Sequence, residues 1–191
     1  ISKITECVKF AEEEVKKFGL RAPMVGHLGD GNFHVLLPYN PEKKETYDVI
    51  NPATEELIGK ASKANSLDIQ KALKSAEKGL EIWKNTSPWE RSKVIRKISE
   101  LLRKRVDILA KWLTLEVGKP ITEGPGEVGG AADIFEWNSE ETKRIYGETL
   151  QSRFPNTKIH VYYQPVGVVA ALVPWNFPVI LASRKISTAL A

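Results

Sequence analysis

Two histidines in a glycine-rich segment are the first side chains whose types could do chemistry. His27 and His34 belong to the segment 26–34, Gly-His-Leu-Gly-Asp-Gly-Asn-Phe-His, which also holds Asp30 and Asn32. Imidazole is a common ligand of zinc and manganese, and glycines allow a loop to fold so that both rings converge on one ion. The spacing fits a structural role equally well, with His34 beginning a strand and His27 bonding a loop carbonyl. A divalent-metal site and a structural loop therefore both remain open.

The composition argues against several other functions. Basic and acidic residues are nearly balanced, 28 against 24, and they are interspersed along predicted helices, as on solvated helix faces. We therefore expect no nucleic-acid partner, and no membrane partner because the longest apolar run, 166–173, is too short to span a bilayer. The single cysteine, Cys7, lies on a predicted amphipathic helix, where we expect a small core residue and no nucleophile. One cysteine excludes a disulfide framework and, with no signal-peptide pattern, favours a cytoplasmic location.

Apolar spacing and capping residues predict a largely helical chain with a few strands. Helices are expected over 2–18, over 67–83 after a cap at Ser66, over a long stretch from Pro88 to Gly118, from Pro125 to about 146, and from Val179 onward. Strands are expected at 35–37, in a hairpin of 47–50 with 57–61, at 158–164 and at 166–173. The run 166–173 is apolar throughout, which is typical of a strand buried on both faces of a parallel sheet. The fold class is therefore predicted to be α/β.

Residues 1–45 resemble part of the carboxyl-terminal domain of FAD-linked oxidases, such as D-lactate, glycolate and D-2-hydroxyglutarate dehydrogenases. The resemblance rests on the signature Gly-His-x-Gly-Asp-Gly-Asn-x-His and on the residues just before it. It implies that His27 and His34 are metal ligands close to a hydroxy-acid substrate, with Asn32 beside them. FAD and a divalent metal are implied only for the family of this fragment. Its FAD-binding domain and acidic metal ligand have no counterpart in the sequence, so we expect the metal site to be incomplete.

Residues 46–191 resemble the amino-terminal portion of NAD(P)-dependent aldehyde dehydrogenases. The segment 48–54 matches the opening hairpin of that family, and 113–120 matches its Leu-Glu-x-Gly-Lys-Pro segment. The most diagnostic stretch is 164–170 followed by 174–178, Pro-Trp-Asn-Phe-Pro. The resemblance implies a truncated aldehyde dehydrogenase fold, preceded by the short α/β fragment. Its parts would be an N-terminal hairpin, helices and the first strand of the doubly wound cofactor domain.

The chemistry of this family gives the turn 174–178 a role. A thiolate that attacks an aldehyde creates an oxyanion, and a side-chain amide already aimed at that oxygen stabilises it without titrating. The resemblance implies that Asn176 is this donor. It also implies that the backbone around Val173, Pro174 and Trp175 contacts NAD or NADP at the carboxyl end of the strand. The alternative is a surface turn bounded by prolines.

Arg184 indicates a class of substrate. A guanidinium group binds a carboxylate through two parallel hydrogen bonds. Arg184-Lys185 and the segments 135–137 and 144–147 resemble succinate-semialdehyde and 2-oxoglutarate-semialdehyde dehydrogenases, in which this arginine contacts the distal carboxylate of the substrate. The alternative is an arginine on an exposed helix face.

The sequence as a whole predicts a join between fragments of two unrelated dehydrogenases, with the boundary between about 40 and 47. The larger fragment predicts NAD(P)-dependent oxidation of an aldehyde, and the full-length members of its family are homo-oligomers. Its nucleophilic cysteine, general-base glutamate and glycine-rich phosphate-binding segment are not in the sequence. We therefore expect the 191-residue chain to be inactive alone. The alternatives are an FAD-linked hydroxy-acid dehydrogenase fragment and a relic or interaction fragment without activity.

Overall fold

The computed structural model describes residues 24–26, 33–35 and 45–191. Strand β1 (Met24–Gly26) pairs antiparallel with β2 (Phe33–Val35), and Val25 lies opposite His34. The strand expected at 35–37 thus begins two residues earlier. Residues 36–37, His27 and the helix expected over 2–18 lie outside the described residues.

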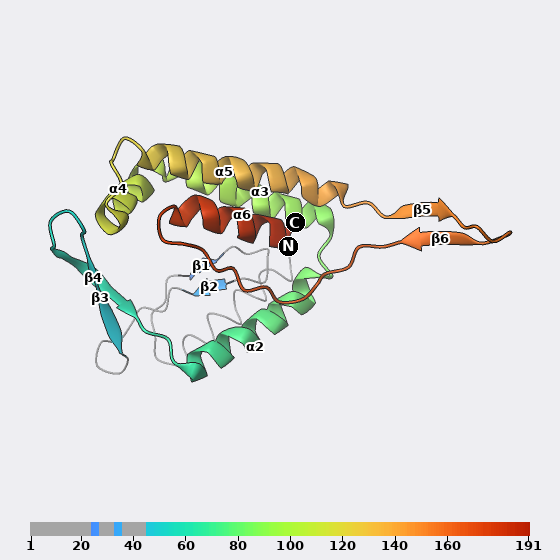
Figure 1. Cartoon of the computed structure of the whole chain (residues 1–191), viewed down its shortest axis with the longest axis horizontal. Coiled ribbons are helices and arrows are strands. Elements are labelled where there is room, and N and C mark those ends of the chain that lie inside the picture. Colours follow the sequence, from blue (N-terminus) through green and yellow to red (C-terminus); the bar gives the residue numbers. More distant parts are fainter. Residues whose placement is uncertain (1–23, 27–32, 36–44) are drawn as a thin grey trace.

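Four helices form the body of the described chain: α3 (Pro88–Lys104), α4 (Val106–Val117), α5 (Gly124–Glu141) and α6 (Pro178–Leu190). Helix α5 is central, because it packs against α3, α4 and α6 (Figure 1). A short 3₁₀ turn, η1 (Thr142–Arg144), continues α5. No helix in the described part of the chain is both long and apolar enough to cross a membrane.

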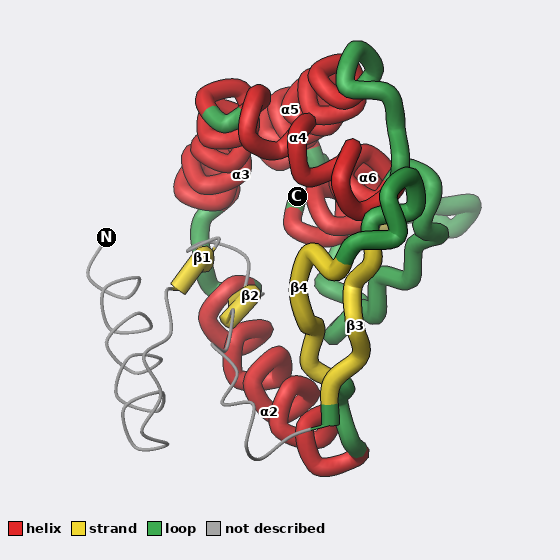
Figure 2. Tube along the Cα trace, turned by 90° about the vertical axis from the view of Figure 1, so that its left-hand side faces the viewer, coloured by secondary structure: helices red, strands yellow, loops and turns green. Residues whose placement is uncertain are grey.

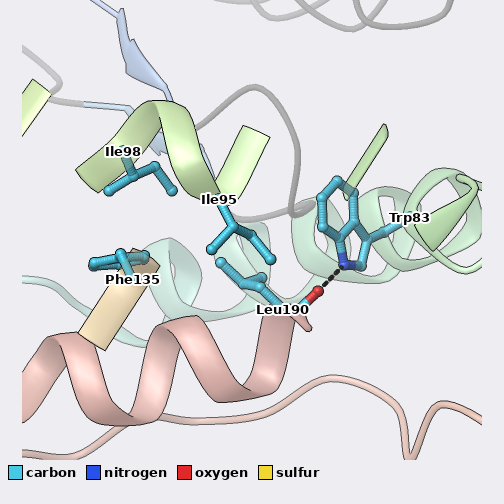
Figure 3. Packing of buried hydrophobic residues seen from close by; sticks show 5 residues of the cluster. All are labelled: Trp83, Ile95, Ile98, Phe135 and Leu190. Carbon is cyan, nitrogen blue, oxygen red and sulfur yellow. Dashed lines mark hydrogen bonds between the residues drawn. The ribbon is translucent and has the colours of Figure 1, made fainter. Parts of the chain in front are cut away.

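The hydrophobic core lies between these helices and the end of α2 (Ser66–Trp83). Figure 3 shows Ile95 and Ile98 of α3 facing Phe135 of α5 and Leu190 of α6. The Trp83 ring closes this cluster, and its Nε1 donates a 3.0 Å hydrogen bond to the carbonyl of Leu190. Burial of such side chains is the main stabilising contribution to a fold of this kind.

The long helix expected from Pro88 to Gly118 is two helices. The chain breaks at Arg105, which has φ −113° and ψ 15°, and α4 begins at the next residue. The break gives α4 its own direction across α5 (Figure 1), and α4 buries Ala110 and Leu113. Both predicted ends are confirmed, since Ser87 accepts a bond from the Glu90 amide and Gly118 adopts the left-handed conformation.

The cap predicted for α2 is wrong by one residue. Asn65 caps the helix, because its Oδ1 accepts hydrogen bonds from the amides of Leu67 and Asp68 at 2.9 and 3.1 Å. The Asp68 carboxylate accepts a hydrogen bond from the Asn65 backbone amide, which completes a capping box. Ser66, the predicted cap, is the first residue of the helix.

Two further hairpins accompany the helices, and Figure 2 shows the strands of the first side by side. The predicted one is confirmed as β3 (Thr46–Ile50) paired antiparallel with β4 (Leu57–Ser62). The second pairs β5 (Glu148–Gln151), which the sequence pattern did not predict, with β6 (Lys158–Val161). The predicted strand over 158–164 therefore ends at Val161. Figure 1 shows the β5–β6 hairpin extending away from the helices.

The expected strand at 166–173 does not form among the described residues. The segment has no strand partner there, and its side chains are largely exposed, with Val166 at 91% and Leu172 at 80%. A strand needs a neighbouring strand that forms hydrogen bonds with its backbone groups. The predicted first strand of the doubly wound domain has no such neighbour among the described residues. The segment instead runs past α2 and α6, and residues of all three line a small groove of about 70 Å³.

Candidate active-site turn

The turn 174–178 connects the exposed segment to α6. Trp175 is 77% exposed, and Asn176 and Phe177 are exposed as well. Phe177 occupies the N-cap position with φ −136° and ψ 63°, and its hydrocarbon side chain offers the helix no hydrogen bond. Pro178 follows at the first helical position, where its missing N–H costs nothing.

A glutamate from another helix satisfies the amides at the start of α6. Oε1 of Glu127, on α5, accepts hydrogen bonds from the amides of Val179 at 2.9 Å and Ile180 at 3.3 Å. The Leu181 amide donates to the Phe177 carbonyl at 3.0 Å. Because Pro178 has no N–H, every amide in the first turn of α6 has a partner or needs none.

Lys119 completes this arrangement at the second carboxylate oxygen of Glu127. Its Nζ lies 2.6 Å from the other oxygen of Glu127, Oε2, and the two side chains are only 6% and 1% exposed. The same ammonium lies 3.5 Å from the centre of the Phe177 ring, within the range of a cation–π contact. We call Lys119 and Glu127 the buried anchor. It connects the residue that follows the C-cap of α4, the first turn of α5 and the start of α6.

Two glycines allow close approaches around the buried anchor, one to the turn between β3 and β4 and one to α6. Gly118, just before Lys119, has φ 75°, and a Cβ there would lie 2.8 Å from Cγ of Pro52, so no other residue fits readily. A Cβ at Gly130 would lie 2.9 Å from Cδ1 of Ile180. Gly130 is three residues after Glu127, so both face α6 from the same side of α5.

The predicted cofactor and oxyanion residues form one continuous stretch. Val173, Pro174, Trp175 and Asn176 lead directly into α6, and the Asn176 side chain makes no hydrogen bond with any described residue. The neighbouring segment is held by a hydrogen bond from Lys185 Nζ to the carbonyl of Leu172. The amide of Asn176 is therefore available to a ligand.

Arg184 is placed differently. It is exposed on α6, about 9 Å along the helix axis from Pro178 at the usual rise per residue. Among residues 45–191 its guanidinium makes no ion pair. The structure thus leaves Arg184 open to a carboxylate, and no hydrogen bond or ion pair among the described residues joins its side chain to the turn.

The metal prediction stays untested. His34 lies in β2, whereas its expected partner, His27, is outside the described residues. In the parts of the chain that the structure describes, no three His, Cys, Asp or Glu side chains are grouped as a metal site would require.

Another group of charges, between α3 and α5, has a structural role. Arg103 Nη2 lies 2.5 Å from Glu136 Oε2, and Arg96 also contacts Glu136, at 3.0 Å, and Glu140. Hydrogen bonds from Arg103, and then from Arg96, hold the pKa of Glu136 below its ordinary value. Since the carboxylate is engaged between two helices, we assign it no catalytic role.

Sequence reasoning missed the two members of the buried anchor. The sequence pattern assigns Lys119 to a helix end and to the Leu-Glu-x-Gly-Lys-Pro segment, and it assigns no role to Glu127. The available signal was a glutamate and a glycine three residues apart on a predicted helix. The pattern does not say that both face a helix more than 50 residues later in the chain.

Comparison with known proteins identifies both parts of the sequence. Residues 39–191 match the model of the aldehyde dehydrogenase family, and residues 1–66 match that of the C-terminal domain of FAD-linked oxidases. The two matches overlap over 39–66, a stretch that contains the predicted boundary. Both resemblances inferred from the motifs are therefore confirmed.

The relatives and solved structures agree on the larger part. A succinate semialdehyde dehydrogenase from Acinetobacter baylyi is 42% identical over 150 residues, which are 78% of this chain and 31% of the relative. A glutarate-semialdehyde dehydrogenase from Pseudomonas putida is 42% identical over 147 residues, with 77% and 31% covered. A crystal structure of an Escherichia coli NADP-dependent enzyme superposes with a TM-score of 0.75 at 38% identity, covering 76% of this chain and 30% of that one. An aldehyde dehydrogenase structure from Brucella melitensis gives 0.78 at 34% identity, covering 90% and 34%.

The chain thus spans about 31% of the length of the curated relatives that it matches. The family model nevertheless matches residues 39–191 without interruption, and the two solved structures superpose on 76% and 90% of this chain. Through residues 39–191, the chain belongs to the aldehyde dehydrogenase family.

Proposed function

We propose that this chain supplies the cofactor- and substrate-facing turn of an NAD(P)-dependent dehydrogenase for carboxylate-bearing aldehydes. One observation carries the proposal. Residues 174–177 of the turn are exposed and the Asn176 side-chain amide makes no hydrogen bond with a described residue, yet the helix that follows is fixed by a buried ion pair. Stabilisation of a developing charge requires a hydrogen-bond donor that has no other acceptor and whose backbone is fixed in position.

In this proposal Asn176 donates to the oxyanion that forms when a thiolate adds to the aldehyde carbon. The backbone around Val173, Pro174 and Trp175 faces the dinucleotide. The relatives support this assignment by their names, which include NADP-dependent succinate-semialdehyde dehydrogenases of Escherichia coli and Saccharomyces cerevisiae.

We further propose that the 191 residues do not turn over an aldehyde alone. The only cysteine in the sequence, Cys7, belongs to the segment that resembles FAD-linked oxidases, and the turn has no nucleophile of its own. Parallel strands beside 166–173 would complete the cofactor site, and the described residues contain none. Saturable binding of NAD by this chain alone, measured by calorimetry, would contradict the proposal.

A chimera tests the function directly. The matching stretch of the Acinetobacter baylyi succinate semialdehyde dehydrogenase is replaced by the corresponding residues of this chain, and NAD(P)H formation is followed. We expect the chimera to oxidise succinate semialdehyde, because the replaced stretch is 42% identical. A folded, cofactor-binding chimera without activity would refute the proposed function.

Arg184 is the proposed carboxylate-binding residue. In the chimera, Arg184→Leu should lower kcat/KM for succinate semialdehyde about 10- to 100-fold, the value of charge-assisted hydrogen bonds, mainly through KM. Butanal, which has the same chain length without the carboxylate, should be oxidised as before. Arg184→Lys keeps the charge but loses the two parallel hydrogen bonds, so its kcat/KM for succinate semialdehyde should lie between those of the parental chimera and of Arg184→Leu. An equal loss for both aldehydes would mean that Arg184 does not recognise the carboxylate.

For residues 1–45 we propose a separate origin, with the boundary between about 40 and 47, and His27 and His34 as two ligands of a divalent metal. The match to FAD-linked oxidases over 1–66 favours this reading. Two ligands hold a metal weakly, since protein sites normally supply three or four. Titration with cobalt should therefore give weak binding in the d–d absorption spectrum, and His27→Ala should abolish it. A signal that survives this substitution would contradict the assignment.

A further inference from the structure

We infer that the buried anchor positions the turn 174–177, and that Glu127 does so by taking over a capping role that Asn176 would otherwise fill. The inference rests on the proposed function only where it concerns the use of the Asn176 amide. Lys119 and Glu127 are thus positioning residues, which act through the backbone of the turn.

The start of α6 needs an acceptor that the turn does not supply. A helix begins with amides that have no intrahelical partner, and Asn, Asp, Ser or Thr next to the start normally accept their hydrogen bonds. Phe177 cannot accept one. Asn176 lies one residue earlier and has a suitable side chain, yet it makes no hydrogen bond to α6. The Glu127 carboxylate accepts from both amides that are left, those of Val179 and Ile180.

The two carboxylate oxygens of Glu127 have different partners. Oε1 accepts from α6, while Oε2 lies 2.6 Å from Lys119 Nζ. A carboxylate is well placed at the positive end of a helix dipole, and the lysine compensates the charge of a side chain that is only 1% exposed. The lysine also contacts the ring of Phe177, so the residue next to Asn176 is held from the same point.

If the Glu127 carboxylate is removed, Asn176 should therefore become the N-cap of α6. With Asn176 as the cap, its Oδ1 would accept from the Val179 amide, the third residue after it. The side-chain carboxamide of Asn176 would then be turned toward the helix, and its NH₂ group would no longer be placed to donate to a substrate. The anchor keeps the turn in the conformation that leaves this side chain free.

Two double variants of the full 191-residue chain isolate the acceptor from the charge. Lys119→Met/Glu127→Gln removes both charges and keeps an oxygen that can accept from α6. Lys119→Met/Glu127→Leu removes both charges and the acceptor with them. Neither variant leaves an unpaired buried charge, so both should fold. Amide hydrogen exchange and nitrogen relaxation are measured by NMR on each chain.

In the leucine variant we expect the amides of Val179 and Ile180 to exchange about tenfold faster or more than in the glutamine variant, as the loss of a part-buried hydrogen bond implies. The side-chain amide resonances of Asn176 should shift in the leucine variant alone. The amides of Ile95 and Ile98 in α3 serve as the control and should exchange equally in both variants. Equal exchange of α6 in the two variants, or a parallel loss in α3, would overturn the inference.

A charge-swapped chain, Lys119→Glu/Glu127→Lys, separates the cap from the ion pair. It restores a pair of opposite charges, but an ammonium cannot accept from an amide. It should behave as the leucine variant does, and recovery of the parental exchange would show that the ion pair alone suffices. These measurements involve no aldehyde. An inactive chimera together with the expected exchange pattern would refute the proposed function alone. An active chimera together with equal exchange of α6 in the two double variants would refute the anchor's role alone.

Discussion

Replacement of Lys119 by methionine is expected to lower the free energy of unfolding by about 3–5 kcal/mol, the usual cost of removing one partner of a buried ion pair. The substitution leaves the Glu127 carboxylate buried and without its counter-charge. Urea denaturation at neutral pH, followed by circular dichroism, measures the change. The size of the effect comes from desolvation, because the charge that remains has no water to replace the lysine.

Lys97→Met is the matched control. Lys97 pairs with Glu100 at 3.0 Å, but the two side chains are 58% and 50% exposed, so the loss should stay below about 1 kcal/mol. Lys119→Met/Glu127→Leu should be more stable than Lys119→Met alone, since it removes the orphaned charge. If Lys119→Met costs no more than Lys97→Met, the pair does not anchor the helices.

Removal of the Asn176 amide should have the largest effect on catalysis. In the chimera, Asn176→Ala is expected to lower kcat about 100- to 1000-fold with little change in KM, as the loss of one oxyanion donor does elsewhere. KM changes little because the amide is needed for the transition state more than for the bound aldehyde. The burst of NAD(P)H in the first turnover measures the chemical step without interference from product release.

Asn176→Asp provides the control for shape. It has nearly the same size, but its carboxylate donates nothing and repels an oxyanion, so it should lose at least as much activity as the alanine variant. Both variants should keep the melting temperature of the chimera, since the side chain is exposed. Activity retained in a folded Asn176→Ala chimera would exclude the role assigned to this residue.

Local features of the fold were predictable where local residues decide them. The β3–β4 hairpin follows from the turn around Pro52, and the ends of α3 and α4 follow from Ser87 and Gly118. In each case the deciding residue acts on a backbone group only a few positions away. The error at α2 is of the same kind, because Asn65 and Ser66 are both good caps and the structure uses the first.

Features that depend on distant partners were not predictable. The run 166–173 has the composition of a buried strand, but a strand exists only when another segment pairs with it. Strand β5 forms because β6 lies beside it, although its own residues show no clear apolar alternation. The buried anchor depends on α4, α5 and α6 meeting at one point. The roles of Asn176 and Arg184 stay predictions.

The remote cap on α6 has a consequence for how substitutions in the turn are tolerated. In most helices the residue at the start must serve the helix, so its side chain cannot be exchanged freely. Here Glu127 of α5 accepts the hydrogen bonds from the first amides of α6, so the side chains before Pro178 do not have to cap the helix. Selection on the turn can therefore act on its chemistry without unwinding the helix behind it.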